Sequence, residues 1–515
     1  MRRAAPRARD VRVTGGFVRG VREGDSIAWR GIPYADAPIG PLRFRSPRPV
    51  RPWAGMRDAS TFGPVATQLQ NGQFAGVAPG IPQGEDCLTI NVVSPAEPTV
   101  RRMPVMVFIH GGGYSAGSSR DFSGEGRSFV RTGEVLYVSF SYRLGALGYL
   151  DFSRYSSRYR RIDSNLGLRD QVAALRWVHR NIAAFGGDPG NVTVFGESAG
   201  GNAITTLMTI PSAGGLFARA IAQSSPANAA YDRALAAAWA ADFVDALRRS
   251  EHDERPRPLT TEETVALLTT TTATALVTAA LAVQACTPQS YPGTFCFAPV
   301  IDGRLLPQHP LHAFRTGHAH RVPLIIGTND REGSVFRGRI DILPRSTSRV
   351  EALFAAAPSA ARAGMGDAYP GLRSGRSTAD FAGDYAFWYP SVKVADYHSR
   401  FARVHSYRFD VAPRLLRWAG LDATHGLEMY ALFDQADAPF ARMITAFGGR
   451  KPFTDAGDRM RDAWLHFATR GTAPDVWPPY DEVTRFTRIF AESDRVEGDP
   501  RSNRRAAWEA FLPLI

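Results

Sequence analysis

The chain has 515 residues, of which 44% are hydrophobic and 21% are charged. This composition excludes a disordered or collagen-like protein and supplies enough apolar residues for a large buried core. The formal net charge of +12 does not indicate a nucleic-acid-binding protein, because the basic residues are spread along the chain and form no basic arm interleaved with aromatics. Only Lys393 and Lys451 among the 61 basic residues are lysines, so genome-wide composition bias explains the charge more simply.

Two segments have some features of targeting or membrane signals. Residues 1–10 are basic, but no apolar core of signal-peptide length follows them, so a cytoplasmic protein is expected, with secretion left open. Residues 265–286 have about the length of a membrane span. Their threonine-rich centre is too polar for lipid, which favours a buried or site-covering helix over a membrane span.

Strands and helices are expected to alternate from the N-terminal third onward. Residues 11–62 contain short apolar pieces broken by glycine and proline, which predict small strands and turns. The apolar runs 104–109 and 135–140 predict fully buried strands. Residues 166–184 carry helical periodicity, and a strand at 191–195 then leads into another helix. This order is typical of a doubly wound α/β protein.

A glycine-rich segment, His110-Gly-Gly-Gly-Tyr114, directly follows the strand predicted at 104–109. Without side chains, the glycines let the backbone approach a substrate carbonyl and turn N–H groups toward it, as in an oxyanion hole. A flexible surface loop is the alternative. The position after a buried strand favours the oxyanion hole.

The segment Gly196-Glu-Ser-Ala-Gly200 fits the G-x-S-x-G pattern of a nucleophile elbow, in which a strand turns sharply into a helix. Ser198 is the candidate nucleophile, and the N–H of Ala199 is a candidate oxyanion donor at the positive end of the helix dipole. A bare match of this kind also occurs in ordinary turns. The elbow therefore needs a histidine and a carboxylate elsewhere in the chain.

Candidates for both partners follow in the order that this fold uses. Asp330 and Glu332 lie just after the strand expected at 323–326, and the residues alone leave the choice between them open. Of the 11 histidines, His425 lies in a loop downstream of a further strand, whereas His179, His398 and His466 fall on expected helices. The chain order nucleophile, acid, base then matches Ser198, one of the two acids, and His425.

The chain resembles the type B carboxylesterase family, relatives of cholinesterases and of bacterial para-nitrobenzyl esterases, within the α/β-hydrolase fold. The resemblance covers residues 13–508 and is carried by the following motifs: Gly31-Ile-Pro-Tyr-Ala, Leu42-Arg-Phe, Glu85-Asp-Cys-Leu-Thr-Ile-Asn-Val, His110-Gly-Gly-Gly-Tyr, Tyr142-Arg-Leu-Gly, Asn165-Leu-Gly-Leu-Arg-Asp-Gln, Phe185-Gly-Gly-Asp-Pro, the elbow, Pro299-Val-Ile-Asp-Gly and His425-Gly-Leu-Glu. It implies a mostly parallel central sheet flanked by helices, with helical insertions over the active site.

The resemblance also assigns residues. It implies Ser198 as nucleophile, His425 as base and Glu332 as acid, and it implies oxyanion donors at Gly112, Gly113 and Ala199. Ser224 and Glu197 are placed around this triad, and an Arg43–Glu85 ion pair is interpreted as scaffold. Weak candidates for the pocket lining are Tyr114, Phe387 and Trp388, for which core packing is the more ordinary role.

The cysteines are expected to contribute little. The family's first disulfide involves the position of Cys87, but its partner position holds no cysteine here, so Cys87 is expected to be free. Cys286 and Cys296 are near enough in sequence to bridge. Free thiols in a reducing compartment are the alternative.

The expected function is hydrolysis of carboxylic esters through a covalent acyl-enzyme, without cofactor or metal. The alternatives are a non-catalytic binding or adhesion protein of the same fold, and an amide or carbamate hydrolase using the same triad. The partner is a small ester whose acyl and alcohol groups the sequence does not identify, and the oligomeric state, monomer or dimer, stays open.

Length alone favours about three domains of roughly 150 residues. Since residues 112–425 must meet at one site, we expect one large domain over 1–515 instead, with a small-strand region at 1–100 and helical insertions at 230–295 and 345–400.

Overall fold

The computed structural model describes residues 9–69, 77–120, 123, 125–250, 257–338, 341–372 and 375–512. Most of the basic N-terminal segment lies outside these ranges. The chain forms two compact units. The first comprises Met1–Val194, Pro211–Arg219 and Arg233–Ala280, and the second comprises Phe195–Ile210, Ala220–Asp232 and Leu281–Ile515. The prediction of a single large domain stays a prediction.

The first unit contains a sheet whose strands follow the order β11-β9-β10-β8-β4-β3. The β9 and β10 strands pair in parallel, whereas β10 with β8, β8 with β4 and β4 with β3 pair antiparallel. Two smaller sheets, β1-β2-β5 and β6-β7, complete its strands. The bounds are β1 (Asp10–Val13), β2 (Gly16–Arg19), β3 (Val21–Glu23), β4 (Ser26–Pro33), β5 (Met56–Asp58), β6 (Val65–Ala66), β7 (Gln83–Gly84), β8 (Thr89–Pro95), β9 (Met103–Ile109), β10 (Leu136–Phe140) and β11 (Gly187–Glu197).

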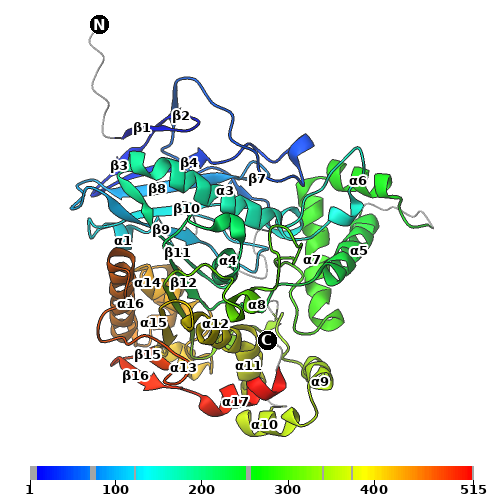
Figure 1. Ribbon diagram of the computed structural model, residues 1–515, viewed down its shortest axis with the longest axis vertical. Helices are drawn as coiled ribbons and strands as arrows, with labels where there is room; N and C mark the ends of the chain where they lie inside the picture. The colour runs from blue at the N-terminus through cyan, green and yellow to red at the C-terminus, as the bar shows by residue number, and fades with distance from the viewer. Residues whose placement is uncertain are drawn as a thin grey trace. The chain divides into compact units, whose positions relative to one another are not determined.

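The buried strands form where the apolar runs predict them. Every residue of β9 and of β10 is buried, as expected for a strand covered on both faces. The unit's helices are α1 (Arg127–Val130), α2 (Gly145–Gly148), α3 (Leu166–Asn181), α5 (Arg233–Ser250), α6 (Thr261–Thr270) and the first part of α7 (Ala273–Ser290) (Figure 1).

The second unit contains a sheet of order β12-β13-β14-β15-β16. The first three pairs are parallel, and β15 with β16 is antiparallel. The bounds are β12 (Arg219–Gln223), β13 (Leu324–Asn329), β14 (Val404–Phe409), β15 (Phe486–Phe490) and β16 (Arg495–Gly498), with α4 (Ala199–Leu207), α8 (Pro310–Arg315), α9 (Thr347–Ala356), α10 (Ala361–Ala368), α11 (Gly375–Gly383), α12 (Tyr389–Ser399), α13 (Arg414–Trp418), α14 (Leu427–Leu432), α15 (Pro439–Thr445), α16 (Arg450–Arg470) and α17 (Ser502–Phe511).

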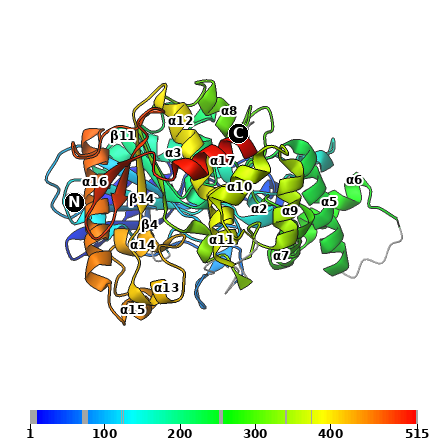
Figure 2. The same ribbon diagram turned by 90° about the horizontal axis from the view of Figure 1, so that it is seen from below.

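Helices cover both faces of this second sheet (Figure 2). Alternate residues of β14 show the two faces. Tyr407 packs its ring against Trp464 of α16, at 5.3 Å between centroids, whereas Ser406 and Arg408 line a small pocket with Ser391 of α12. Parallel strands covered on both faces agree with the α/β-hydrolase fold that the family resemblance implies.

The threonine-rich segment of about membrane-span length is folded into two helices. The α6 and α7 helices meet at an angle of 114°, and no single described helix is long and apolar enough to cross a bilayer. The Arg43–Glu85 ion pair lies next to this bend. Arg43 bonds both Glu85 oxygens, at 2.8 and 2.5 Å, and also donates to the carbonyl oxygen of Thr271 at 2.6 Å.

The three cysteines are all free, with Cys87 and Cys296 buried and Cys286 exposed. The two lysines also differ in exposure. Lys393 on α12 is 8% exposed and lies near Asp396 and Glu509. The side chain of Lys451, at the start of α16, is 84% exposed.

Candidate active site

Ser198 stands at the junction of β11 and α4, where the backbone reverses. Its φ of 60° and ψ of −123° are values that a residue with a side chain adopts only under strain. The turn is fixed by the Ser198 N–H, which donates to the carbonyl oxygen of Gln223 at 3.0 Å. Gly201 permits the close approach, because a Cβ there would lie 2.4 Å from that same oxygen. The half-buried Ser198 is thus presented at the N-terminus of α4, where the first N–H groups, including that of Ala199, have no acceptor within the helix.

A chain of hydrogen bonds joins Ser198, His425 and Glu332, all in the second unit. Nε2 of His425 lies 2.8 Å from Oγ of Ser198, and Nδ1 lies 2.5 Å from Oε2 of Glu332. The other oxygen, Oε1, accepts from the Ser224 hydroxyl and from the Asn329 backbone N–H, each at 2.6 Å. Glu332 is 2% exposed, so its carboxylate is shielded from water. Both of its oxygens have hydrogen-bond partners within the protein. A hydroxyl, an imidazole and a carboxylate linked in this order can activate the hydroxyl as a nucleophile.

The two acids left open by the sequence have different partners. Glu332 contacts His425, whereas Asp330 bonds to Arg501 through Oδ1 at 2.6 Å and lies 3.6 Å from Arg408. The structure therefore brings Glu332, the acid implied by the family resemblance, to the histidine.

Two aromatic rings pack against the imidazole of His425. The Phe387 ring lies 4.4 Å from it and the Phe336 ring 5.1 Å, between centroids. Phe387 lies in a π-helical turn, Asp384–Trp388, and its neighbour Trp388 points elsewhere, beneath the guanidinium of Arg501 at 5.6 Å. Of the two candidate lining residues in this turn, Phe387 is thus the one beside the histidine.

The glycine segment lies in the first unit and forms a tight turn after β9. Gly112 and Gly113 have φ values of 105° and 59°, which favour glycine, and a Cβ on Gly112 would lie 2.3 Å from the Ala116 oxygen. Tyr142 donates to the His110 carbonyl oxygen at 2.7 Å and stacks on the His110 ring. Tyr114 is 3% exposed and stacks on Tyr149, so it packs in the core. The oxyanion role of the two glycines stays a prediction.

Comparison with known proteins identifies the family of the chain. Residues 7–508 match the model of the carboxylesterase family. The chain belongs to the carboxylesterase family. It is 36% identical over 500 residues to the para-nitrobenzyl esterase of Bacillus subtilis (strain 168), covering 95% of this chain and 96% of that protein. It is 32% identical to the phenmedipham hydrolase of Pseudarthrobacter oxydans, covering 94% and 97%. A solved PNB esterase structure superposes with a TM-score of 0.85 at 33% identity, covering 97% of this chain and 99% of that one.

In this carboxylesterase, several carboxyl groups surround the histidine. Oε1 of Glu197 lies 3.2 Å from Nε2 of His425, in addition to Glu332 on the other nitrogen. Burial opposes protonation of the imidazole. The negative charges of Glu197 and Glu332 outweigh it and raise the pKa of His425 to about 9.

A third carboxyl group, Glu428 on the first turn of α14, is fully buried. It accepts hydrogen bonds from Asn329 Nδ2 at 2.5 Å and from Gln223 Nε2 at 3.2 Å. Burial, and then repulsion from Glu197 and Glu332, raise its pKa to about 8. The pKa of Glu428 is thus raised by the same crowding of carboxyl groups that raises the pKa of His425.

Sequence reasoning did not single out Glu428 or Asn329. A signal was present, because Glu428 is the glutamate of the His425-Gly-Leu-Glu motif and lies three residues after the histidine, at the start of an otherwise apolar helix. Among the described residues, no group of three or more His, Cys, Asp or Glu side chains is arranged to hold a metal ion.

Proposed function

We propose that the chain is a serine carboxylesterase in which Ser198 is the nucleophile, His425 the general base and then the general acid, and Glu332 the carboxylate that orients the imidazole. The hydrogen-bonded series Ser198–His425–Glu332 is the observation that carries this proposal. Membership in the carboxylesterase family supports the ester as the substrate class.

The reaction proceeds in two halves. His425 Nε2 takes the Ser198 proton as Oγ bonds to the ester carbonyl carbon, and the imidazolium then gives that proton to the departing alcohol oxygen as the carbon–oxygen bond breaks. Water attacks the acyl-enzyme in the same way, with His425 taking its proton and returning one to Ser198 Oγ. Glu332 balances the imidazolium charge in both halves. Gly112, Gly113 and Ala199 are the proposed oxyanion donors, each worth about 3 kcal/mol of barrier.

The substrates to test first come from the relatives. One relative is named as an esterase for para-nitrobenzyl compounds, so a para-nitrobenzyl ester is the first choice, and phenmedipham is the second. The aromatic rings of Phe336 and Phe387 beside His425 suit a substrate with an aromatic group. A cytoplasmic location stays part of the proposal, and a small-molecule ester is its partner.

Replacement of the proposed nucleophile tests the function. Ser198→Ala is expected to lower kcat for ester hydrolysis by a factor of about 10⁵ to 10⁶, because no acyl-enzyme can form. Ser212→Ala, at an exposed serine, is the control and should keep the parent rate. A fluorophosphonate should label Ser198 in the parent chain. Near-normal turnover by Ser198→Ala contradicts the proposal, and a parent chain with neither adduct nor hydrolysis favours a binding protein.

A further inference from the structure

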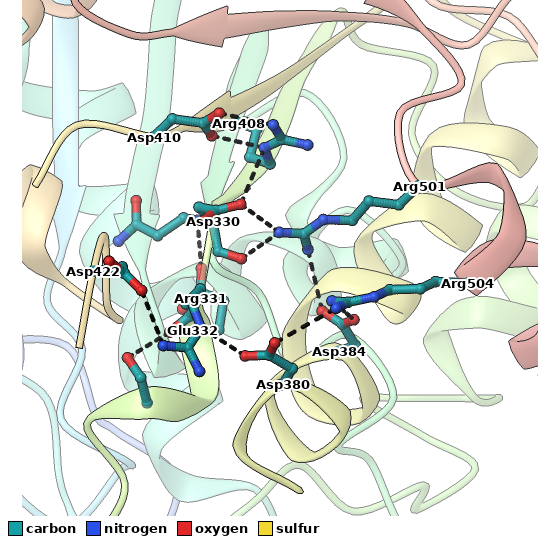
Figure 3. A network of polar contacts seen from close by, with 12 residues as sticks. Asp330, Arg331, Glu332, Asp380, Asp384, Arg408, Asp410, Asp422, Arg501 and Arg504 are labelled. Atoms are coloured by element: carbon teal, nitrogen blue, oxygen red, sulfur yellow. Dashed lines mark hydrogen bonds and ion pairs between the residues drawn. The ribbon is translucent and has the colours of Figure 1, made fainter. Parts of the chain in front are cut away.

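Arg331 is a buried cation directly beside the proposed catalytic acid. Its side chain is 5% exposed, yet it turns away from Glu332 toward other groups (Figure 3). Nε donates to Asp380 Oδ1 at 2.7 Å, and Nη1 donates to Asp422 Oδ2 at 3.0 Å and to the Gly420 carbonyl oxygen at 2.7 Å. The two carboxylates balance its charge, so the guanidinium does not compete with His425 for Glu332.

Two of the three acceptors of the Arg331 side chain, Asp422 and Gly420, lie on the segment that carries the histidine. We define residues 329–334 as the acid loop and residues 420–425 as the histidine loop. Besides the two bonds from Nη1 of Arg331, its backbone N–H donates to the Ala423 oxygen at 2.9 Å. Other residues of the acid loop add further bonds: Ser334 Oγ contacts the Leu421 oxygen at 2.6 Å, and Asn329 Nδ2 donates to the Thr424 oxygen at 2.7 Å.

The histidine loop has no regular secondary structure, and its own backbone hydrogen bonds are turns to α13 and within the loop, such as Leu421 N–H to the Leu416 oxygen at 2.9 Å. It lies between α13 and α14, and residues 420–425 belong to neither a helix nor a strand. Asp422 has a φ of 52° although it is not a glycine, and Gly420 has a φ of 68°. Aspartate adopts this conformation more readily than most residues with a side chain, and the contacts around Asp422 hold it in place. Arg331 binds both of these residues.

We propose that Arg331 is a positioning residue: its guanidinium fixes the histidine loop against the acid loop and so keeps Nδ1 of His425 in line with Oε2 of Glu332. The proposal rests on the proposed function of the triad. Arg331 acts through His425, and its side-chain bonds go to Asp380, Asp422 and Gly420. Arginine suits this role, because its rigid fork reaches acceptors in different directions, whereas lysine offers one point of attachment.

The test replaces Arg331 with lysine, which keeps the charge and loses the fork. Active sites are counted with a fluorophosphonate, and kcat, KM and the pH profile of kcat/KM are measured on a para-nitrobenzyl ester. Arg331→Lys is expected to lower kcat per active site by about 10- to 100-fold with KM within about twofold, because a displacement on the order of 1 Å at a catalytic group has this effect.

The pH profile separates positioning from general stability. Glu197, Glu332 and Glu428 face His425 from three different elements, and loss of alignment with Glu332 removes one of the charges that favour the imidazolium. The acid limb of kcat/KM should therefore move to lower pH in Arg331→Lys. A variant that merely unfolds more easily changes the number of active sites and leaves this midpoint in place.

Arg376→Met is the matched control. Arg376 also donates to Asp422 Oδ2 at 3.0 Å, but its side chain is 65% exposed and makes no hydrogen bond or ion pair to the acid loop within the described part of the chain. It should keep the parent kcat and midpoint. Asp422→Asn is a second, milder variant, since asparagine tolerates this backbone conformation, and a smaller change in the same direction is expected.

The proposal is overturned if Arg331→Lys has the same kcat as the parent chain and the same midpoint in the acid limb of its kcat/KM profile. If Arg331→Lys does not accumulate as folded protein, parent values in Asp422→Asn overturn it instead. These outcomes are distinct from failure of the proposed function, which is decided by Ser198→Ala and by fluorophosphonate labelling and ester hydrolysis in the parent chain.

Discussion

Two clusters of charged residues share the acid loop and differ in their charge balance. We call the first the carboxylate cluster, formed by Glu197, Glu332 and Glu428 around the single imidazole of His425. We call the second the arginine network (Figure 3), and it consists of Asp330, Arg331, Asp380, Asp384, Asp422, Arg408, Arg501 and Arg504.

The carboxyl groups of Asp330 and Glu428, one in each cluster, have their pKa values shifted in opposite directions. Burial favours the neutral acid in both. In the arginine network, Arg501 and Arg408 overcome it and hold the pKa of Asp330 below its ordinary value. In the carboxylate cluster, further carboxylates add to burial and raise the pKa of Glu428. The arginine network is not uniform, because burial outweighs Arg501 and Arg504 at Asp384 and raises its pKa. Arginines thus offset burial at Asp330, whereas in the carboxylate cluster the negative charges of Glu197 and Glu332 favour the protonated imidazole of His425.

The largest expected effect comes from breaking the carboxylate cluster at Glu332. Glu332→Gln should lower kcat by about 10³- to 10⁴-fold, because the amide cannot balance the imidazolium or hold the imidazole in the required tautomer. The measurement is kcat per fluorophosphonate-titrated site. Asp330→Asn, two residues away in the arginine network, is the control and should stay within a few-fold of the parent. Equal losses in both variants would show that the two clusters do not differ in function.

Breaking the arginine network should affect stability instead. Arg501→Met removes the cation between Asp330 and Asp384, of which Asp384 is 4% exposed, and should lower the free energy of unfolding by about 3 kcal/mol. Denaturant unfolding measures this loss. Arg495→Met, at a half-exposed ion pair with Glu497, should change it by less than about 1 kcal/mol. A shifted pH profile of kcat/KM with an unchanged free energy of unfolding would contradict this prediction, because Arg501 would then act on catalysis and not on stability.

The smallest expected effect is a change in the pH dependence of kcat/KM when Glu197 of the carboxylate cluster is replaced. The base must be neutral, so kcat/KM should rise with pH, with a midpoint above the ordinary histidine value of 6.5. Glu197→Gln removes a charge that favours the imidazolium, so the midpoint should fall by about one pH unit. Rates at a series of pH values measure it. Glu351→Gln, at an exposed position on α9, should leave the midpoint in place, and an equal shift there would point to a general charge effect.

The parts of the site that could be predicted from the sequence are those encoded locally. Ser198 and the glycine segment each follow a buried strand within a few residues. The position of each motif directly after an apolar run was therefore enough to predict the turn that it forms. The choice between Asp330 and Glu332 could not be made in this way, because Glu332 begins a 3₁₀ turn, Glu332–Ser334, where side-chain direction does not follow strand alternation. The family resemblance was needed to select Glu332.

The arginine network was beyond sequence reasoning for a different reason. Asp330 and Arg501 are 171 positions apart, and no periodicity links them. The fold itself was more accessible, since the apolar runs predicted β9, β10 and β13 to within a few residues. The early strand β8 is one of the antiparallel exceptions in the mostly parallel sheet that the resemblance implies, since it pairs antiparallel with both β10 and β4.

The use of arginine in almost every basic position has a chemical consequence for an enzyme that handles acylating compounds. Activated esters modify primary amines and spare guanidinium groups. Lys393 is enclosed by Asp396, Glu509 and the ring of Tyr397, which leaves Lys451 as the one lysine amine open to such reagents. Lys451 lies at the solvent-facing start of α16 and bonds only to Asp455 among the described contacts. Among the side chains of this protein, amine-directed reagents should therefore modify Lys451 in preference to Lys393.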